Sequence, residues 1–128
     1  MDKPLQIKEL SFAKLKFYKY YVIAVIDEDT VVSDTHFNEL IQNFDERFGD
    51  EGYVYIANRE NNYNVNPIYF KKLEEISKMK ALAVVNHNTS SIEINNFEKH
   101  FCPIPYVVFD ELENAVAWAE DFMINKAP

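Results

Sequence analysis

The hydrophobic and polar positions along the chain predict a hairpin followed by alternating strands and helices. From Leu10 to Tyr18, apolar and polar side chains alternate with the period of a half-exposed strand. Tyr21–Ile26 is almost entirely apolar and rich in β-branched residues, as a buried strand is. Only Lys19 and Tyr20 separate the two segments, so a crossover helix cannot fit and we expect an antiparallel pair.

Four segments after this hairpin have the caps or the apolar spacing of helices. The first begins near Ser33 and ends at Gly49, which suits a helix C-terminus because glycine adopts positive φ readily. Its apolar residues recur at the helical period: Phe37, Leu40, Ile41, Phe44 and Phe48. The others are expected to open at Asn66-Pro67 and run to residues 78–80, at a Ser90/Glu93 capping box, and at Asp110.

The last two predicted helices also carry apolar residues at helical spacing. In the third helix these are Ile94, Phe97 and Phe101, and we expect the helical phenylalanines to belong to the core. In the last helix, small alanines allow close approach to the sheet. The predicted inner face consists of Leu112, Ala115, Val116, Ala119, Phe122 and Met123.

Apolar strands are expected between these helices at Tyr53–Ala57, Ala81–Val85 and Tyr106–Phe109. The order β-β-α-β-α-β-α-β-α predicts an α/β fold with a mostly parallel sheet and right-handed crossovers. Because no linker or internal repeat divides the 128 residues, we expect a single domain, residues 1–128, with its core at about residues 10–123.

Composition narrows the classes of function. Apolar residues make up 48% of the chain, which indicates a packed core, and 2 Gly are too few for a glycine-rich phosphate loop. A net charge of -8 argues against nucleic acid and against anionic membranes as partners. Tyr20–Ile26 is too short to span a membrane, Cys102 is the one cysteine, and no signal peptide follows Met1, so a soluble cytoplasmic protein is expected.

The sequence contains no signature of catalysis or of metal binding. His36, His87 and His100 lie in different segments, and His100 with Cys102 supplies too few ligands for zinc. Cys102 lacks the surroundings that activate a thiol, and no GxSxG, HExxH or CxxC motif occurs. We therefore expect a protein that is not an enzyme and needs no cofactor or metal.

Two polar clusters follow neighbouring predicted strands, at residues 58–64 and 86–90. Parallel strands place their carboxyl ends at one edge of the sheet, close to helix N-termini that favour anions. The candidate ligand- or partner-binding residues are Asn58, Arg59, Tyr63, His87 and Ser90. The structural alternative is that Asn and Ser cap helices and bind the local backbone there, which explains Arg59 and Tyr63 least.

Several motifs together carry a family resemblance: GYVYIANR at 52–59, Tyr63-Asn64-Val65-Asn66-Pro67, ALAVV at 81–85 and PYVVFDELENAVAWAE at 105–120. They resemble the STAS domain, and within it the SpoIIAA-like branch of small stand-alone bacterial proteins. This resemblance implies a mixed, mostly parallel sheet of four or five strands with an N-terminal β-hairpin, and four helices packed mostly on one face.

The resemblance also bears on regulation. Anti-sigma-factor antagonists of this superfamily bind a kinase and are switched by phosphorylation of a serine in an Asp-Ser-Ser-Gly type motif. The matching region here, residues 58–67, contains no Ser or Thr, and Ser90 and Ser91 lie one βα unit later. The branch also has a topological likeness to CRAL-TRIO lipid-transfer domains, which implies a small apolar ligand as an alternative, although a short chain limits the room.

Two hypotheses therefore stand. The leading one is a non-enzymatic regulatory or interaction module of the STAS type, without the phosphoacceptor, that binds an unidentified protein through the hairpin edge or the Arg59/Tyr63 loop with its neighbouring helix. The alternative is a carrier or sensor of a small apolar or anionic ligand held by Arg59, Tyr63 and His87. Homodimerisation through the hairpin edge is compatible with both.

Overall fold

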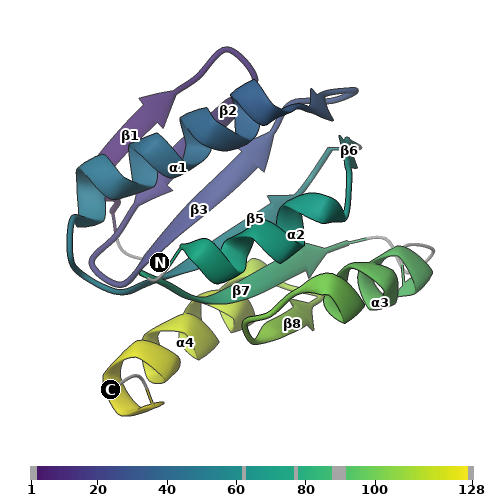
Figure 1. The fold of residues 1–128 in the computed structure, drawn as a ribbon. Coiled ribbons are helices and arrows are strands. Elements are labelled where there is room, and N and C mark those ends of the chain that lie inside the picture. Colours follow the sequence, from purple (N-terminus) through teal and green to yellow (C-terminus); the bar gives the residue numbers. More distant parts are fainter. Residues whose placement is uncertain (1–2, 62, 77, 88–91, 127–128) are drawn as a thin grey trace.

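A six-stranded sheet forms the centre of the protein, in the order β1-β2-β3-β5-β7-β8 (Figure 1). The structure is a computed structural model and describes residues 3–61, 63–76, 78–87 and 92–126. The strands of this sheet are β1 Gln6–Glu9, β2 Ala13–Phe17, β3 Tyr21–Ile26, β5 Tyr53–Arg59, β7 Met79–Asn86 and β8 Tyr106–Phe109. A separate two-stranded ladder pairs β4 Val31–Val32 with β6 Asn64–Val65 in parallel.

The sheet is mixed, as predicted. β1, β2 and β3 pair antiparallel, which confirms the hairpin, and the pairs β3–β5, β5–β7 and β7–β8 are parallel. Strand β1 is additional to the elements predicted from the sequence: Gln6 pairs with Phe17 and Glu9 with Lys14. An edge strand is held by backbone hydrogen bonds and can be polar, so it leaves no apolar pattern in the sequence. In the part of the chain that the structure describes, the sheet therefore has six strands and not four or five.

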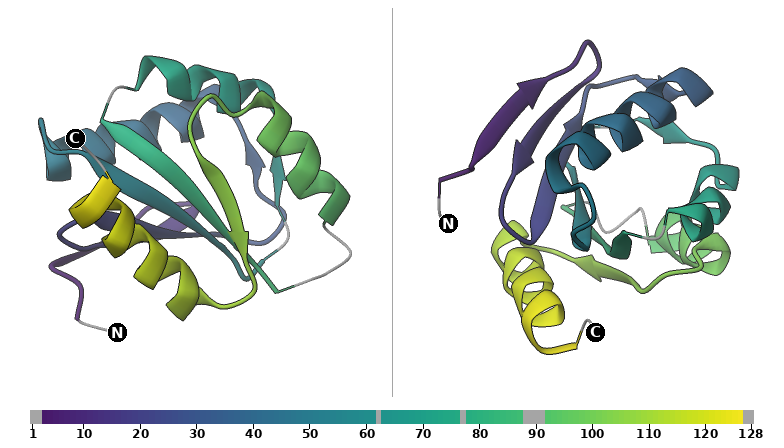
Figure 2. Two further views of the ribbon diagram at one scale, coloured as in Figure 1. Left: turned by 90° about the horizontal axis from the view of Figure 1, so that it is seen from below. Right: turned by 60° about the vertical axis from the view of Figure 1, so that its left-hand side comes forward.

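Among the described residues, four α-helices cover the sheet, three on one face and one on the other (Figure 2). Helices α1, α2 and α3 share one face, and α4 lies on the opposite face, which agrees with the expected arrangement of helices mostly on one side. The bounds are α1 Asp34–Phe48, α2 Ile68–Lys72, α3 Ile92–Phe101 and α4 Leu112–Asp121. A 3-10 turn at Leu73–Glu75 follows α2, and a π-helical turn at Phe122–Lys126 follows α4.

Helix α1 forms as its sequence predicts. The Ser33 hydroxyl accepts a hydrogen bond from the His36 backbone N–H at 3.3 Å, and the His36 imidazole accepts one from the Ser33 N–H at 3.2 Å, so the two residues form a capping box. The helix ends at Gly49, which has a φ of 58°. Its inner face buries Leu40, Phe44 and Phe48 against the sheet.

Two helix boundaries differ from the prediction. Helix α2 ends at Lys72 and continues only as the 3-10 turn, because β7 starts at Met79, two residues earlier than expected, and takes the chain into the sheet. Helix α4 has Glu111 and not Asp110 at its N-cap, and Glu111 makes no side-chain cap hydrogen bond.

The sheet separates two apolar cores. The larger core lies under α1, α2 and α3 and is rich in aromatic side chains, including Phe17, Phe44, Phe48 and Tyr53. Phe48 and Tyr53 stack with ring centroids 4.4 Å apart. The smaller core lies under α4, where Ala81, Ala83, Ala115 and Ala119 pack with larger residues such as Tyr21 and Ile56. The carboxyl ends of β5 and β7 open beside the larger core.

Candidate functional site

The candidate site lies at the carboxyl ends of β5 and β7, where Arg59 and Asn86 are paired in register. A groove of about 370 Å³ runs along this edge, and Arg59, Tyr63 and His87 all line it. Three of the five residues singled out from the sequence therefore come together. Glu98 and Ile94 of α3 form part of the same groove.

Asn58, a fourth predicted residue, does not join this group. Asn58 precedes Arg59 on β5, and successive side chains of a strand point to opposite faces, so Asn58 lies in the groove on the α4 side with Ile23 and Leu112. Its Nδ2 donates to Glu60 Oε2 at 3.0 Å. Ser90 and the predicted capping box lie outside the described residues.

Arg59 is the centre of a buried polar network. Its Nη2 donates to Glu98 Oε1 at 2.7 Å, its Nη1 to Asn95 Oδ1 at 3.3 Å, and its Nε to the Tyr63 hydroxyl at 3.2 Å. The Tyr106 hydroxyl donates to the same Glu98 oxygen at 2.7 Å. One guanidinium thus links the end of β5 to the loop after it and to α3, and Glu98 extends the link to β8.

The Arg59–Glu98 ion pair is shielded from water. The two side chains are 13% and 5% exposed. Burial by itself lowers the pKa of Arg59, but the surrounding Tyr63 and Glu98 outweigh it, so the net shift of the Arg59 pKa is upward. Because the carboxylate of Glu98 already balances this charge, Arg59 does not offer a free cation to an anionic ligand.

Helix α3 is oriented with polar side chains inward. Asn95 and Glu98 are each 4% exposed, whereas Ile94 is 57% and Phe97 55% exposed. The expectation that the helical phenylalanines belong to the core is therefore wrong for Phe97. The physical reason is Arg59: a buried guanidinium needs a carboxylate, and turning Glu98 inward turns the apolar side of the helix toward solvent.

Sequence reasoning missed Asn95, Glu98 and Tyr106 as members of this network. Asn95 and Glu98 are three residues apart and so share one side of the helix, as Ile94 and Phe97 do on the other. The periodicity alone fits either orientation. The one available signal was an arginine at the end of a buried strand, which calls for a counter-ion from a later element.

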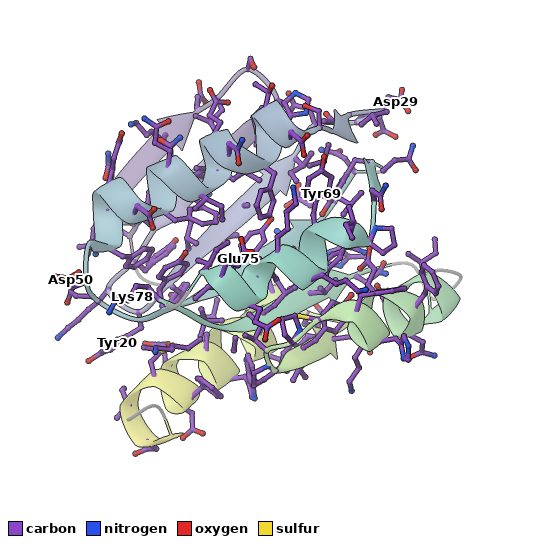
Figure 3. All side chains as sticks on the ribbon, viewed as in Figure 1. Tyr20, Asp29, Asp50, Tyr69, Glu75 and Lys78 are labelled. Atoms are coloured by element: carbon purple, nitrogen blue, oxygen red, sulfur yellow. The ribbon has the colours of Figure 1, made fainter. Side chains whose placement is uncertain are left out.

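A second, apolar cavity of about 60 Å³ lies under α1 and α2, next to the groove. Arg59, Tyr63 and Val65 line both spaces and form the wall between them. Tyr69 closes the cavity between α1 and α2 (Figure 3): its ring stacks on Phe37 at 5.2 Å, and its hydroxyl donates to Asp34 at 2.9 Å.

Other groups of possible chemical interest have local structural roles. Burial raises the pKa of the half-buried Cys102 thiol, which makes this thiol less reactive. Within residues 3–61, 63–76, 78–87 and 92–126, no three His, Cys, Asp or Glu side chains are grouped so that they could hold a metal ion. None of the helices in that part of the chain has the length and apolarity needed to cross a membrane.

This architecture is that of an α/β protein with the SpoIIAA-like fold. The structure resembles a crystal structure of an uncharacterized protein of the DUF3478 family with a SpoIIAA-like fold from Shewanella loihica PV-4, with a TM-score of 0.58. The match covers 93% of this chain and 98% of that one at 10% sequence identity, so it shows the fold alone. The fold implied by the sequence motifs is thus confirmed. No family model and no curated protein matches the chain.

Proposed function

We propose that the chain is a non-enzymatic interaction module that binds a protein partner through the α3 face, defined here as Ile94, Phe97 and Phe101. The orientation of α3 is the observation that carries this proposal, because the helix buries Asn95 and Glu98 and leaves Ile94 and Phe97 more than half exposed. Apolar side chains grouped on a surface in this way are typical of contact sites.

This orientation is maintained against the hydrophobic effect. Burying a phenylalanine side chain stabilises a protein by roughly 1.5–3 kcal/mol relative to leaving it exposed. Rotating α3 to bury Phe97 would remove Glu98 from Arg59 and Tyr106 and leave a charged guanidinium unpaired. Removing one partner from a buried ion pair costs about 3–5 kcal/mol, which exceeds the gain. The polar network therefore keeps the aromatic surface outward.

The α3 face is also partly preorganised for contact. The rings of Phe97 and Phe101 meet edge to face with centroids 5.0 Å apart, and the Lys71 ammonium lies 5.4 Å from the Phe101 ring centre. Aromatic side chains held in place lose less conformational entropy when a partner binds. The absence of Ser and Thr from residues 58–67 argues against the phosphorylation switch of the anti-sigma-factor antagonists, so any regulation would act through binding itself.

Quantitative affinity capture tests the proposal. Wild type, Phe97→Ser and the control Ile124→Ser would be immobilised and exposed to extract of the native cells. Ile124 is 60% exposed in the turn after α4, which matches Phe97 in exposure but lies outside the α3 face. We expect a protein retained by wild type and by Ile124→Ser to fall at least tenfold with Phe97→Ser. Equal retention by all three, or retention of nothing, would contradict the proposal.

A further inference from the structure

We propose that the cavity under α1 and α2 is a binding site for a short uncharged amphiphile, with its hydrogen-bonding head at Tyr55 and Tyr63 and its carbon chain toward the core. This inference is independent of the proposed protein contact, because Phe97 and Phe101 do not line the cavity and its other end is enclosed by core residues.

The volume sets the length of the apolar part. The cavity of about 60 Å³ is lined mainly by aliphatic and aromatic side chains, among them Leu40, Phe44, Leu73, Met79, Leu82 and Val84. Roughly 150 Å³ is enough to bind benzene in an engineered apolar cavity, so this space suits a chain of a few carbon atoms and excludes a long acyl chain.

Two tyrosines supply the polar end. The Tyr55 hydroxyl has no hydrogen-bond partner in the described part of the chain, although its ring lines the cavity and contacts Phe44. Burial raises the pKa of Tyr55, so this hydroxyl keeps its proton and can donate it. The Tyr63 oxygen accepts from Arg59 Nε, which leaves its own O–H to donate toward a ligand. A ligand oxygen that accepts hydrogen bonds fits both.

The charges of the wall favour an uncharged head. Arg59 lines the cavity, but its charge is matched by Glu98 at 2.7 Å. A carboxylate head would bring a second negative charge next to this pair without a cation of its own, and a buried charge without a partner is unfavourable. An alcohol, an amide or a carbonyl head needs only hydrogen bonds.

The wall also places the groove next to the cavity. Arg59, Tyr63 and Val65 face the polar groove on one side and the apolar cavity on the other. A molecule entering from the groove would pass between the side chains of the short segment after β5. Its head would then remain at the boundary between the two spaces, near Tyr63.

The test uses 1-butanol and butyrate as probes, followed by methyl NMR of the intact chain. We expect saturable shifts of the Leu40, Leu82 and Val84 methyl groups with 1-butanol, and at least tenfold weaker binding of butyrate. Tyr55→Phe should weaken 1-butanol binding by about 2- to 10-fold, the loss expected for one hydrogen bond. Shifts that do not saturate, or butyrate binding equal to that of 1-butanol, would overturn the proposal.

A cavity-filling pair of variants locates the site. Ala57 and Val84 line the cavity and are paired in register on β5 and β7, so Ala57→Val and Val84→Ile each add methyl groups to the same space. Each should reduce 1-butanol binding at least fivefold while the spectrum remains that of a folded protein. If one variant fails to fold, the other decides: unchanged binding by a folded filling variant refutes the assigned site.

Discussion

Helices α3 and α4 have the same length, ten residues, and precede and follow β8 in the chain, yet they attach to the sheet in opposite ways (Figure 2). Helix α4 buries Ala115, Val116 and Ala119 in an apolar core that also contains Ala81 and Ala83. Helix α3 buries Asn95 and Glu98 and exposes Ile94 and Phe97. Small apolar residues position one helix, and an ion pair positions the other.

The difference shows what an amphipathic pattern can and cannot determine. Both helices have apolar residues at helical spacing, and for α4 this pattern points to the core as expected. For α3 a single buried charge on another element, Arg59, decides the orientation. The surface that results on α3 exposes Ile94 and Phe97 beside Asn96, Lys99 and His100, because Asn95 and Glu98 are needed inside.

The largest expected change in stability comes from breaking the Arg59–Glu98 ion pair. Glu98→Leu leaves the Arg59 guanidinium buried without a carboxylate, and we expect the free energy of unfolding to fall by about 3–5 kcal/mol. Urea unfolding measures this. The double variant Arg59→Met/Glu98→Leu removes both charges and should recover at least half of the loss. A single variant that costs less than about 1 kcal/mol would mean that the pair does not hold α3.

Alkaline pH should lower the stability of the protein through Tyr106, which belongs to the same polar network. Burial first, and then Glu98, raise the pKa of Tyr106 above that of an unfolded tyrosine, which is near 10. The native state therefore keeps this proton when the unfolded state has lost it. The resulting stabilisation is full below pH 10 and declines as the pH rises above it, by up to about 1.4 kcal/mol per pH unit.

Tyr106→Phe is the matched variant, since it lacks the ionising group. Its free energy of unfolding between pH 10 and 11.5 should decline less steeply with pH than that of wild type, by up to about 1.4 kcal/mol per unit. Parallel curves for the two proteins would show that Tyr106 ionises equally in the folded and unfolded states.

On the α4 side of the sheet, stability should depend on the size of the buried side chains and not on their charge. Ala119 is completely buried, and Ala119→Leu is expected to destabilise the protein by about 1–3 kcal/mol through overpacking. Ala117 is exposed on the same helix, so Ala117→Leu should change stability by less than about 0.5 kcal/mol. Thermal unfolding of the pair checks this. Equal effects would mean that α4 does not approach the sheet through its alanines.

The smallest change in stability is expected from substitutions on the α3 face. Because Phe97 is 55% exposed, Phe97→Ser should change the free energy of unfolding by less than about 0.5 kcal/mol, unlike a core phenylalanine. Phe44→Ser in α1, where the ring is fully buried, should cost at least about 3 kcal/mol by comparison. A similar loss in both variants would place Phe97 in the core.

Most of the fold could be predicted because its signals are local. The hairpin, helix α1 and its end at Gly49, and strand β8 follow from periodicity, caps and chain length between elements. Strand β1 could not, because a polar edge strand depends on backbone pairing with β2. The length of α2 could not be predicted either, because it depends on where β7 begins to pair with the sheet.

The position of the candidate site could be predicted from the sequence, but the residues that pair with Arg59 could not. Parallel strands bring their carboxyl ends together, which is enough to place Arg59, Tyr63 and His87 on one groove. The identity of the counter-ion required knowing that α3 crosses this edge with Glu98 inward. That contact joins residues 39 apart in the chain, and no spacing rule covers it.

The orientation of α3 is the central claim, and thiol labelling tests it most directly. Single cysteines at Phe97→Cys and Asn95→Cys, in a Cys102→Ser background, would be treated with a thiol reagent under native conditions. Phe97 is 55% exposed and Asn95 4%, so the thiol at 97 should react at least a hundredfold faster than the thiol at 95, after correction for any difference in thiol pKa. Faster labelling at 95 than at 97 would show that the helix buries its apolar side, and would contradict the account.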